Sequence, residues 1–481
     1  MKRKGAPTKA QSKPKKPRPD VPEYHLAPSV HEEDGSVQWP APNSQIERAR
    51  EIIREWQVFL RRQVERPADV HSAQSQRQTL IVPDKDADGL SSGAILRHTL
   101  MLLGLPADCI DVHLLRKGNN VYSEVERQAM AKQKPAYIFV VDHGSRAGPP
   151  LVDAEGTTTL IIDHHEATDD DFPEKSEHVS ACHSPPVATS SLLTYEICEP
   201  LHPDVKDICG WLCVVGTHGD LGNTLKWEPP FPDMRDVMKK YTKKVLNDVV
   251  SLVNAPRRTA TYDVISAWDA LCETVEPRSV LKVTRLLAAR AEVSAEVERC
   301  THAAPKFSPD GKVAVFRIRS EAQVHPVIAT RWAGHLQSKA LEFVMVANEG
   351  YLPGLVNFSC RIPRCARNRD PPISIIEQLR FYASLTELDS VSAAAQGQRT
   401  PLIERIGDNF ARGHVQASGG IVGVDEFEEL MRLMKIGEKL AKKDDEDGSP
   451  VKAKKKGGIN PGQKNTLMGY FGKKDMTGAA S

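Results

Sequence analysis

The 481-residue sequence has no disulfide framework and no long apolar segment. Its nine cysteines show no paired spacing, and neither Cys209 and Cys213 nor Cys360 and Cys365 have partners at zinc-site spacing. We therefore expect free thiols and a reducing compartment. The sequence has no stretch of about 20 apolar residues and no secretory signal, so we expect a soluble intracellular protein that does not bind membranes. The net charge of +1 shows no basic excess of the kind typical of nucleic-acid-binding chains.

Positive charge is nevertheless concentrated at the two ends of the chain. Residues 1–19 contain eight Lys or Arg and no acid, and residues 452–474 are also basic. The clusters Lys2–Lys4 and Lys13–Arg18 resemble a bipartite nuclear localisation signal. They predict a eukaryotic nuclear protein with a nuclear import receptor as a partner. The alternative is a solvated tail that touches phosphates without specificity.

Between these ends the hydrophobic pattern predicts alternating strands and helices. An amphipathic helix is predicted over residues 44–64. Three short apolar runs, at 79–83, 136–141 and 159–162, are each followed by an acid and are separated by helical stretches. This pattern predicts a parallel sheet buried on both faces. Further helices are predicted at 188–197, 206–217 and 234–254.

The chain is therefore predicted to be an α/β protein with two domains and basic tails. The second domain is indicated by strands at 313–318, 341–347 and 356–362 and helices at 326–339, 373–382 and 425–438. A long helical stretch over 277–303 precedes it, with Pro277 suited to a first helical position. The predicted boundaries are a disordered tail (1–43), a parallel-sheet catalytic domain (44–258), a helical linker (259–305), a smaller α/β domain (306–438) and a disordered tail (439–481).

Carboxylates follow three successive predicted strands. The motifs are Asp84-Lys-Asp86-Ala-Asp88-Gly89, Asp142-His143-Gly144 and Asp163-His164-His165, and a fourth acid lies in Gly216-Thr-His-Gly-Asp220. Because the carboxyl ends of parallel strands point into one crevice, we expect these side chains to meet there. A cluster of acids is costly unless cations neutralise it. Asp and His ligands suit Mn²⁺ or Mg²⁺, and two such ions about 3.5–4 Å apart can hydrolyse a phosphate ester.

Each motif taken singly has a plainer interpretation. The first is typical of an acidic turn, and a calcium-binding loop is disfavoured because Ile95 stands where a glutamate is expected. Asp163-His164-His165 alone is typical of a polar turn. Four such motifs in this order, each after a strand or a helix, favour a metal site.

In this order, the four motifs resemble those of the DHH phosphoesterases, over roughly Thr79–Ile436. The resemblance implies two divalent cations, Mn²⁺ preferred over Mg²⁺, with Asp142 bridging them. The implied metal ligands are Asp84, Asp86, Asp88, Asp142, His164 and Asp220. It also implies that His165 faces the substrate phosphate, so that His165 and Asp142 are the catalytic residues. Val82 stands where the family often has a histidine, so one ion either lacks a ligand or takes Asp84 instead.

The predicted second domain resembles the DHH-associated domain of the same family. Arg412-Gly413-His414-Val-Gln-Ala-Ser-Gly419-Gly420 resembles its glycine-rich signature, and Phe358–Arg361 resembles its phosphate-gripping strand. Adjacent glycines let backbone N–H groups approach a phosphate, and arginine binds one bidentately. The implied substrate-binding residues are Arg361, Gly413, His414, Gly419 and Gly420. The alternative for the glycine-rich stretch is an ordinary flexible loop.

A segment at the end of the predicted catalytic domain, Asn254-Ala-Pro-Arg257-Arg258, also resembles a family segment. Its arginines are expected to line the cleft between the domains, the alternative being ordinary surface arginines.

The C-terminal tail contains an apolar cluster flanked by lysines. Leu467, Tyr470 and Phe471, within Lys464–Lys474, resemble the box that docks on the sliding clamp of replication. One 3₁₀ turn places these three side chains on one side as an apolar plug. The box usually begins with glutamine, whereas here Lys464 holds that place and Gln463 comes one residue too early. The alternative is a stray aromatic pair in a polar tail.

Together the resemblances imply a two-metal phosphodiester hydrolase. The leading interpretation is a RecJ-like exonuclease that digests single-stranded DNA in replication or repair. The alternatives are an oligoribonuclease or nucleotide-bisphosphate phosphatase and, from another class, an inactive RecJ-like replication scaffold. The middle of the chain shows little basic or aromatic stacking signal, which favours short oligonucleotides over processive digestion. The preference for DNA or RNA, the direction of digestion and the oligomeric state stay open.

Overall fold

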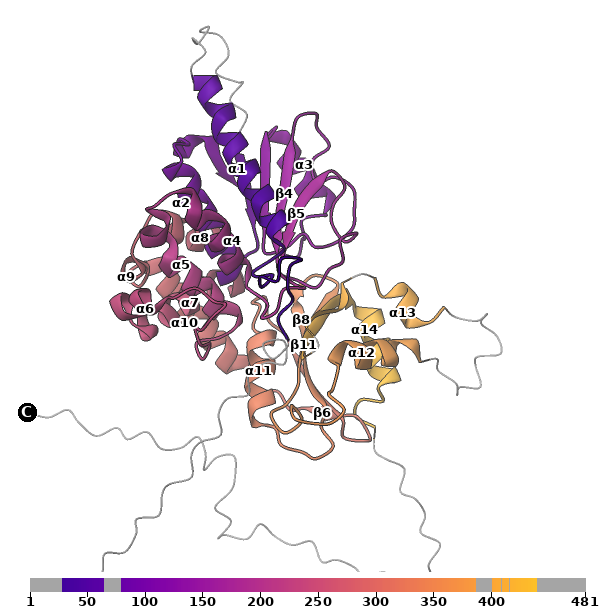
Figure 1. Cartoon of the computed structure of the whole chain (residues 1–481). Helices are drawn as coiled ribbons and strands as arrows, with labels where there is room; N and C mark the ends of the chain where they lie inside the picture. Colours follow the sequence, from indigo (N-terminus) through magenta and orange to yellow (C-terminus); the bar gives the residue numbers. More distant parts are fainter. Residues whose placement is uncertain (1–27, 65–78, 386–399, 408, 415, 439–481) are drawn as a thin grey trace, which may run out of the picture. The chain divides into compact units, whose positions relative to one another are not determined.

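The fold is described from a computed structural model of the chain. The structure describes residues 28–64, 79–385, 400–407, 409–414 and 416–438. These residues form two β-sheets with their helices (Figure 1). Both the nuclear-signal clusters and the clamp-like box lie outside the described residues. Among the described residues, no helix combines the length and hydrophobicity that a membrane-spanning segment needs.

The first sheet has five parallel strands in the order β2-β1-β3-β4-β5. They are β1 (Thr79–Pro83), β2 (Ile110–Val112), β3 (Tyr137–Val141), β4 (Thr158–Asp163) and β5 (Ser176–Ser180). The three predicted apolar runs are β1, β3 and β4, and they are almost wholly buried. This confirms the predicted parallel sheet. Pro83 lies opposite Val141, and Val141 opposite Ile162, so the residues after these three strands leave the sheet at the same level.

Helices cover both faces of this sheet. They are α1 (Asn43–Val64), α2 (Ala87–Leu102), α3 (Glu124–Lys132), α4 (Ser190–Cys198), α5 (Val205–Asp220), α6 (Arg235–Tyr241), α7 (Lys243–Val253), α8 (Val264–Cys272), α9 (Pro277–Val280) and α10 (Thr284–Cys300). Ile81 and Phe139 pack into the core with α2, α4 and α5. Val82 and Ile138 pack on the opposite face, with Met130 of α3.

Two predicted helices are broken in the structure. The helix predicted at 234–254 is divided into α6 and α7 at Thr242, whose φ of 63° cannot continue a right-handed helix. The stretch predicted at 277–303 is divided into α9 and α10. Pro277 does occupy the first turn of α9, as predicted.

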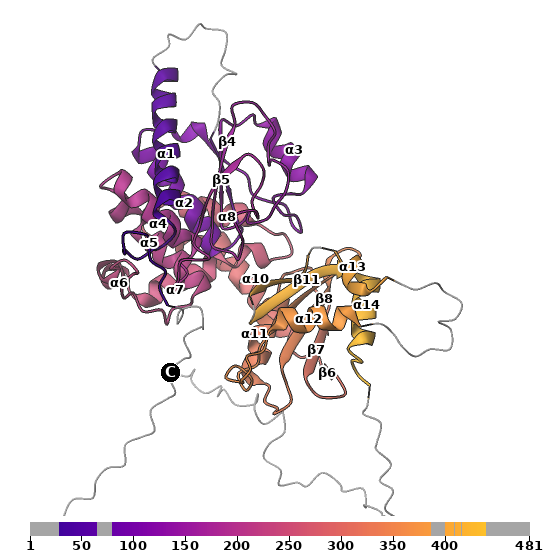
Figure 2. The same ribbon diagram turned by 45° about the vertical axis from the view of Figure 1, so that its right-hand side comes forward.

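The second sheet has six strands in the order β10-β11-β9-β8-β7-β6, of which only β7 and β8 pair in parallel. They are β6 (Lys306–Phe307), β7 (Val313–Ile318), β8 (Phe343–Leu352), β9 (Leu355–Arg361), β10 (Phe410–His414) and β11 (Ala417–Gly423). Its helices are α11 (His325–His335), α12 (Ile375–Ser384), α13 (Leu402–Arg405) and α14 (Val424–Leu433). Helices α12 and α14 share one face of the sheet (Figure 2), and α11 packs on the other.

The segment before α1 differs from its prediction. Residues 28–42 were expected within a disordered tail, but the structure describes them, and residues 38–42 are partly or fully buried. Trp39 Nε1 donates to Pro186 O at 2.8 Å, and its ring lies 5.4 Å from that of Phe231. Ala41 is fully buried. These apolar residues complete the core beside α1. The prediction of disorder rested on the overall composition of the tail and therefore missed this short apolar segment. The nine cysteines are free, as predicted, and only Cys365 is exposed.

Candidate metal centre

Three acids meet at the C-terminal edge of the first sheet, after β1, at β3 and at β4. The Asp84 amide donates to Val141 O at 3.0 Å, and the Asp142 amide donates to Ile162 O at 2.9 Å. Asp163 ends β4 beside them. Asp142 has a left-handed backbone with φ 68°, a conformation that Asp and Asn adopt more readily than most residues. The acids predicted at the strand ends therefore lie side by side.

The first turn of α2 adds two further carboxylates. Asp86 caps this helix by accepting hydrogen bonds from the amides of Asp88 at 3.1 Å and Gly89 at 3.3 Å. Asp88 is fully buried and accepts the amides of Ser190 and Ser191, at the start of α4, at 2.8 and 2.9 Å. Burial and the nearby Asp220 carboxylate nevertheless raise the pKa of Asp88 to about 6. Its charge is costly without a cation beside it.

His164 lies at the centre of the cluster. Its Nε2 is 3.3 Å from Asp142 Oδ1, 3.3 Å from Asp220 Oδ2 and 4.0 Å from Asp88 Oδ2. Burial lowers the pKa of His164, but the carboxylates of Asp142 and Asp220 more than offset this and raise it well above its ordinary value. The surrounding carboxylates thus stabilise a positive charge at this position.

Asp220 reaches the cluster because α5 packs closely against α2 and α4. A Cβ at Gly216 would overlap the Ser191 side chain and lie 2.9 Å from Asp88 Oδ1. Gly216 therefore sets how near the last turn of α5 comes to the metal cluster.

The donor atoms form three overlapping groups within the described residues. They are Asp84, Asp86 and Asp142; Asp88, His164 and Asp220; and Asp142, His164 and His165, with all donor atoms of a group within 4.8 Å of one another. Asp142 Oδ1 and His164 Nε2 are buried, and within the described residues they lie 3.3 Å apart as an ion pair without a well-aligned hydrogen bond to either atom. Buried oxygen and nitrogen donors left in this state fit a divalent cation such as Mn²⁺ or Mg²⁺.

The position that departs from the family pattern is an apolar core residue. Val82 is fully buried among Leu80, Ile138 and Val140 and offers no side-chain donor. Only its carbonyl is used, by His143 Nε2 at 2.8 Å. Asp84, two residues later, lies in a donor group instead.

His165 is held by Asp163, which lies outside the set of residues selected from the sequence. Asp163 Oδ1 is 2.8 Å from His165 Nδ1, and its other oxygen accepts from the Ser145 hydroxyl at 2.6 Å. Burial raises the pKa of Asp163, but His165 and His164 hold it below its usual range. The His165 side chain keeps 44% of its surface exposed, so its outer edge is accessible to a substrate.

A cationic cluster is formed by residues from both halves of the chain. Arg257 Nη2 lies 3.7 Å from Asp86 Oδ2, and Arg258, Arg361 and His325 lie close enough to influence one another electrostatically. Burial, together with Arg361 and Arg258, lowers the pKa of His325 to about 3. Arg258 Nε and His325 Nδ1 are buried, and neither has a hydrogen-bond partner in the described part of the chain. Such a cluster suits an anion.

The predicted glycines lie inside the second sheet. Gly419 and Gly420 pair with Ser359 and Phe358 of β9. A Cβ at Gly420 would lie 2.8 Å from the Phe358 ring, and one at Gly419 would overlap the Phe358 carbonyl. Close strand packing by itself therefore requires glycine at these two positions. Gly413 and His414 lie in β10, paired with Ser418 and Ala417, and Leu467, Tyr470 and Phe471 lie outside the described residues.

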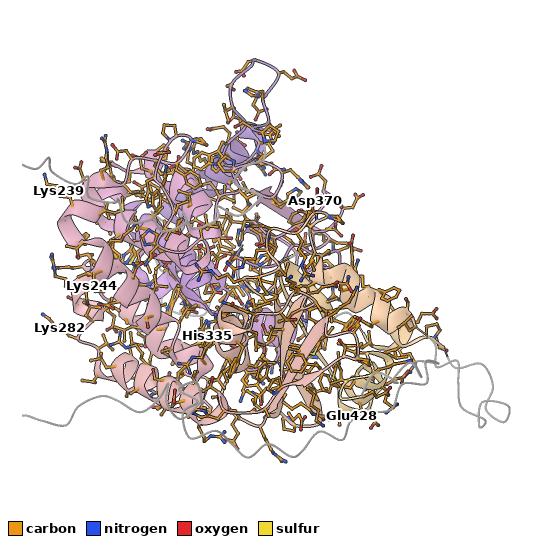
Figure 3. The ribbon with its side chains drawn as sticks, turned by 90° about the horizontal axis from the view of Figure 1, so that it is seen from below. Lys239, Lys244, Lys282, His335, Asp370 and Glu428 are labelled. Atoms are coloured by element: carbon orange, nitrogen blue, oxygen red, sulfur yellow. The ribbon has the colours of Figure 1, made fainter. Side chains whose placement is uncertain are left out.

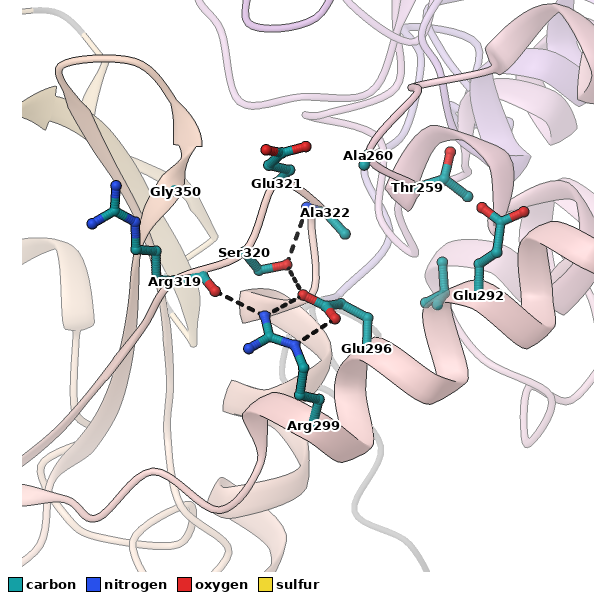
Figure 4. Close-up of a pocket in the computed structure, with 11 residues that line it drawn as sticks. Thr259, Ala260, Glu292, Glu296, Arg299, Arg319, Ser320, Glu321, Ala322 and Gly350 are labelled. Carbon is teal, nitrogen blue, oxygen red and sulfur yellow. Dashed lines mark hydrogen bonds and ion pairs between the residues drawn. The ribbon is translucent and has the colours of Figure 1, made fainter.

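A cavity of about 540 Å³ lies apart from the predicted site, between α10 and the segment that leads into α11. Glu296 spans it by accepting from Arg299 Nε at 2.8 Å and from the Ser320 hydroxyl (Figure 4). The Arg299 and Ser320 hydrogen bonds outweigh burial and lower the pKa of Glu296 to about 2. This network fixes α10 to the segment that carries His325.

Comparison with known proteins gives a family match for the first half of the chain. Residues 78–214 match the DHH family, N-terminal domain. No curated protein matches the sequence. A solved RecJ from Thermus thermophilus, in complex with Mn²⁺, has a TM-score of 0.52 at 16% identity and covers 83% of this chain. A solved DHH domain, described as belonging to a member of a family of ribosomal proteins, has a TM-score of 0.56 at 14% identity.

The aligned regions differ in extent. The chain covers 55% of the Thermus RecJ chain, and thus about half of its length. The alignment with the DHH domain covers 82% of this chain and 90% of the other. At these identities the two structures show a shared fold. The family match covers the three motifs at the strand ends and stops within α5, before Gly216–Asp220. Residues 78–214 are thus similar to the DHH family, N-terminal domain, and the described chain shares its fold with the Thermus RecJ and the solved DHH domain.

Proposed function

We propose that this protein is a divalent-metal-dependent phosphodiesterase that acts on the end of a single-stranded nucleic acid, as a RecJ-like exonuclease. The observation that supports this proposal best is the clustering of the Asp and His side chains into three groups, each with its donor atoms within 4.8 Å of one another. The Mn²⁺ in the Thermus RecJ structure, which shares this fold, supports the same interpretation.

The donor groups suggest how two ions are held. Asp84, Asp86 and Asp142 would hold one ion, and Asp88, His164 and Asp220 the other, with Asp142 reaching both. When bound, such ions polarise a phosphate oxygen, lower the pKa of a water and stabilise the displaced oxygen. The capping hydrogen bonds to Asp86 and Asp88 fix their carboxylates before any ion arrives, which lowers the cost of ordering the site.

His165 is placed to act on the substrate phosphate. Asp163 holds its Nδ1, which leaves Nε2 as the outward-facing nitrogen. Burial lowers the pKa of His165, while the Asp163 charge outweighs this and raises it. A protonated imidazole donates a hydrogen bond to a phosphate oxygen as negative charge develops there. Asp163 is accordingly a positioning residue.

The cationic cluster supplies a place for the phosphate at the substrate end. Arg258, Arg361 and His325 bring buried N–H donors together, and within the described residues neither Arg361 nor His325 pairs with a carboxylate. Arg361 Nη1 donates hydrogen bonds to Ser359 Oγ at 2.9 Å and to Cys360 O at 2.8 Å, and these two bonds orient the guanidinium. A terminal phosphate would satisfy these donors and their charge together.

The first experiment is hydrolysis of end-labelled single-stranded DNA, single-stranded RNA and dinucleotides by the purified protein. We expect cleavage with Mn²⁺ or Mg²⁺ and none with a chelator, because the carboxylates cannot polarise phosphate on their own. The product ladder gives the direction of digestion, and the substrate panel separates an exonuclease from an oligoribonuclease or a nucleotide-bisphosphate phosphatase. Absence of cleavage on every substrate and metal would instead favour the inactive replication scaffold.

We propose further that the protein acts in the nucleus, through an import receptor, and that its tail binds the sliding clamp. Deletion of residues 464–474 is expected to reduce clamp binding at least tenfold, because Leu467, Tyr470 and Phe471 form its apolar plug. Titration of labelled clamp measures this. The matched control replaces Lys464 and Lys474 by alanine and keeps the plug. Equal clamp affinity of the deletion and the full chain would remove the proposal.

A further inference from the structure

The junction between α6 and α7 gathers exposed positive charge. Residues 235–244, Arg-Asp-Val-Met-Lys-Lys-Tyr-Thr-Lys-Lys, contain five cations and one acid, a net charge of +4. The cations are exposed. Arg278 joins them, since its Nη2 donates to Lys240 O at 2.9 Å. We call the following residues the α6–α7 basic surface: Lys239, Lys240, Lys243, Lys244, Arg278 and Lys282.

Three side chains of this surface project on the same side. Lys239, Lys244 and Lys282 come from α6, α7 and the turn after α9, and all three extend outward at one edge of the molecule (Figure 3). Helix α7 packs against both α6 and α9. Charges from three separate elements therefore form one surface.

The charges are not balanced locally. Within the described residues, Lys239, Lys243 and Lys282 form no ion pair, and the pairs Lys244–Asp248 and Arg278–Glu276 are exposed. These two pairs and Asp207, which acts on Lys240, offset part of the charge, and the lysines without an ion pair leave the surface net positive. A nucleic-acid backbone offers the opposite charge at regular spacing.

The first turn of α7 carries positive charge where negative charge is favoured. Lys243 and Lys244 occupy its first turn, which contains no acid. The N-terminal end of a helix carries a partial positive charge, so two ammonium groups there destabilise the free protein. Natural sequences break such rules mainly at functional sites. An anion bound at this turn would relieve the repulsion.

This surface is linked to the candidate metal centre. Lys243 and Asn247 are four residues apart on α7 and share one face of it. Asn247 Oδ1 lies 3.1 Å from His218 Nδ1. His218 precedes Asp220 by two residues in the last turn of α5. Helix α7 therefore packs directly on the helix that carries Asp220.

We propose that the α6–α7 basic surface binds the phosphate backbone of the single strand beyond the nucleotides held at the metal centre. This inference rests on the proposed function and adds a substrate class to it, namely strands long enough to reach α6. Most of these cations are neighbours in the sequence, and folding adds Arg278 and Lys282 to them.

The test compares long and short strands. Both variants are made in the full chain with Asp142→Asn, so that the substrate is not hydrolysed. The test variant combines Lys239→Glu, Lys243→Glu and Lys282→Glu. Binding of oligodeoxythymidylates of 30 and 5 nucleotides is measured by fluorescence anisotropy at several salt concentrations. We expect the 30-mer to bind at least tenfold more weakly, and the slope of log affinity against log salt to fall by about 2, since each single-strand phosphate contact contributes about 0.7.

A matched control reverses three exposed cations elsewhere, Arg54, Lys132 and Lys339, and should leave the preference for the 30-mer intact. With Asp142 restored, the ratio of kcat/KM for the 30-mer to that for a dinucleotide should fall at least tenfold. The proposal is overturned if the affinity for the 30-mer is unchanged, or if the two triple variants lose equal affinity. An unchanged affinity would mean that the basic surface binds an acidic protein instead of a nucleic acid. The binding measurement does not depend on turnover. If the wild-type protein shows no hydrolysis, the proposed reaction is refuted, and the binding data still test whether the α6–α7 basic surface holds a single strand.

Discussion

Replacing Asp142 by Asn is expected to reduce metal-dependent hydrolysis at least about 10³-fold, equivalent to about 4 kcal/mol of transition-state stabilisation. Asp142 lies in two of the three donor groups, so its loss weakens both proposed ion sites. Asn is the suitable replacement because it keeps the side-chain shape and tolerates the left-handed backbone at φ 68°. The Asp142→Ala variant should be equally inactive and somewhat less stable.

The same Asp142→Asn substitution should stabilise the metal-free protein. Burial and Asp88 raise the pKa of Asp142, which means that its charge is unfavourable in the absence of a cation. Thermal melts in chelator should therefore give a higher Tm for Asp142→Asn than for wild type, and added Mn²⁺ should raise only the wild-type Tm. Asp153→Asn is the control, because Asp153 is exposed and pairs with Lys175. Wild-type rates in Asp142→Asn would refute the two-metal mechanism.

Replacing Arg258 by Met is expected to lower kcat/KM about 10²-fold for strands that carry a terminal phosphate, equivalent to about 2.7 kcal/mol. Burial and Arg257 lower the pKa of Arg258 to about 9, so its charge is retained at neutral pH but held at a cost. Met keeps the apolar stem and removes both the charge and the unpaired Nε. The free protein should consequently be more stable, and Mn²⁺ binding should persist.

The control for Arg258 is Arg331→Met, since Arg331 is exposed and pairs only with Glu298 at 3.4 Å within the described residues. Substrates with and without the terminal phosphate are compared by steady-state kinetics. A similar loss on both kinds of substrate would show that Arg258 acts on the fold and not on the phosphate.

The first sheet and its acids were predictable because their signals are local. Each apolar run that is followed by an acid, at Asp84, Asp142 and Asp163, indicates within a few residues both a strand and a side chain at the carboxyl edge of the sheet. The short strand β5, Ser176–Ser180, was not predicted, since it lies at the edge of the sheet and is largely polar. Its pairing comes from β4, and not from its own composition.

The supporting residues of the site depend on long-range packing and were missed for that reason. Nothing near Asp88 in sequence indicates that its partners are the amides of Ser190 and Ser191, about a hundred residues later. Likewise, His325 directly precedes the helix predicted at 326–339, and only folding brings it close to Arg258 and Arg361. The glycine pair at 419–420 suggested a loop at a phosphate, but the structure places it within a strand.

The hydrogen bonds between Asp88 and α4 have a consequence for the lifetime of the protein. The carboxylate that would hold an ion also anchors the start of a helix in the main core, where α2, α4 and α5 pack together. A chain that loses its ions therefore keeps mutually repelling charges inside that core, and local opening there becomes easier. Proteases cleave opened chains faster than closed ones. The supply of metal would then determine not only how fast the protein works but also how long each copy survives.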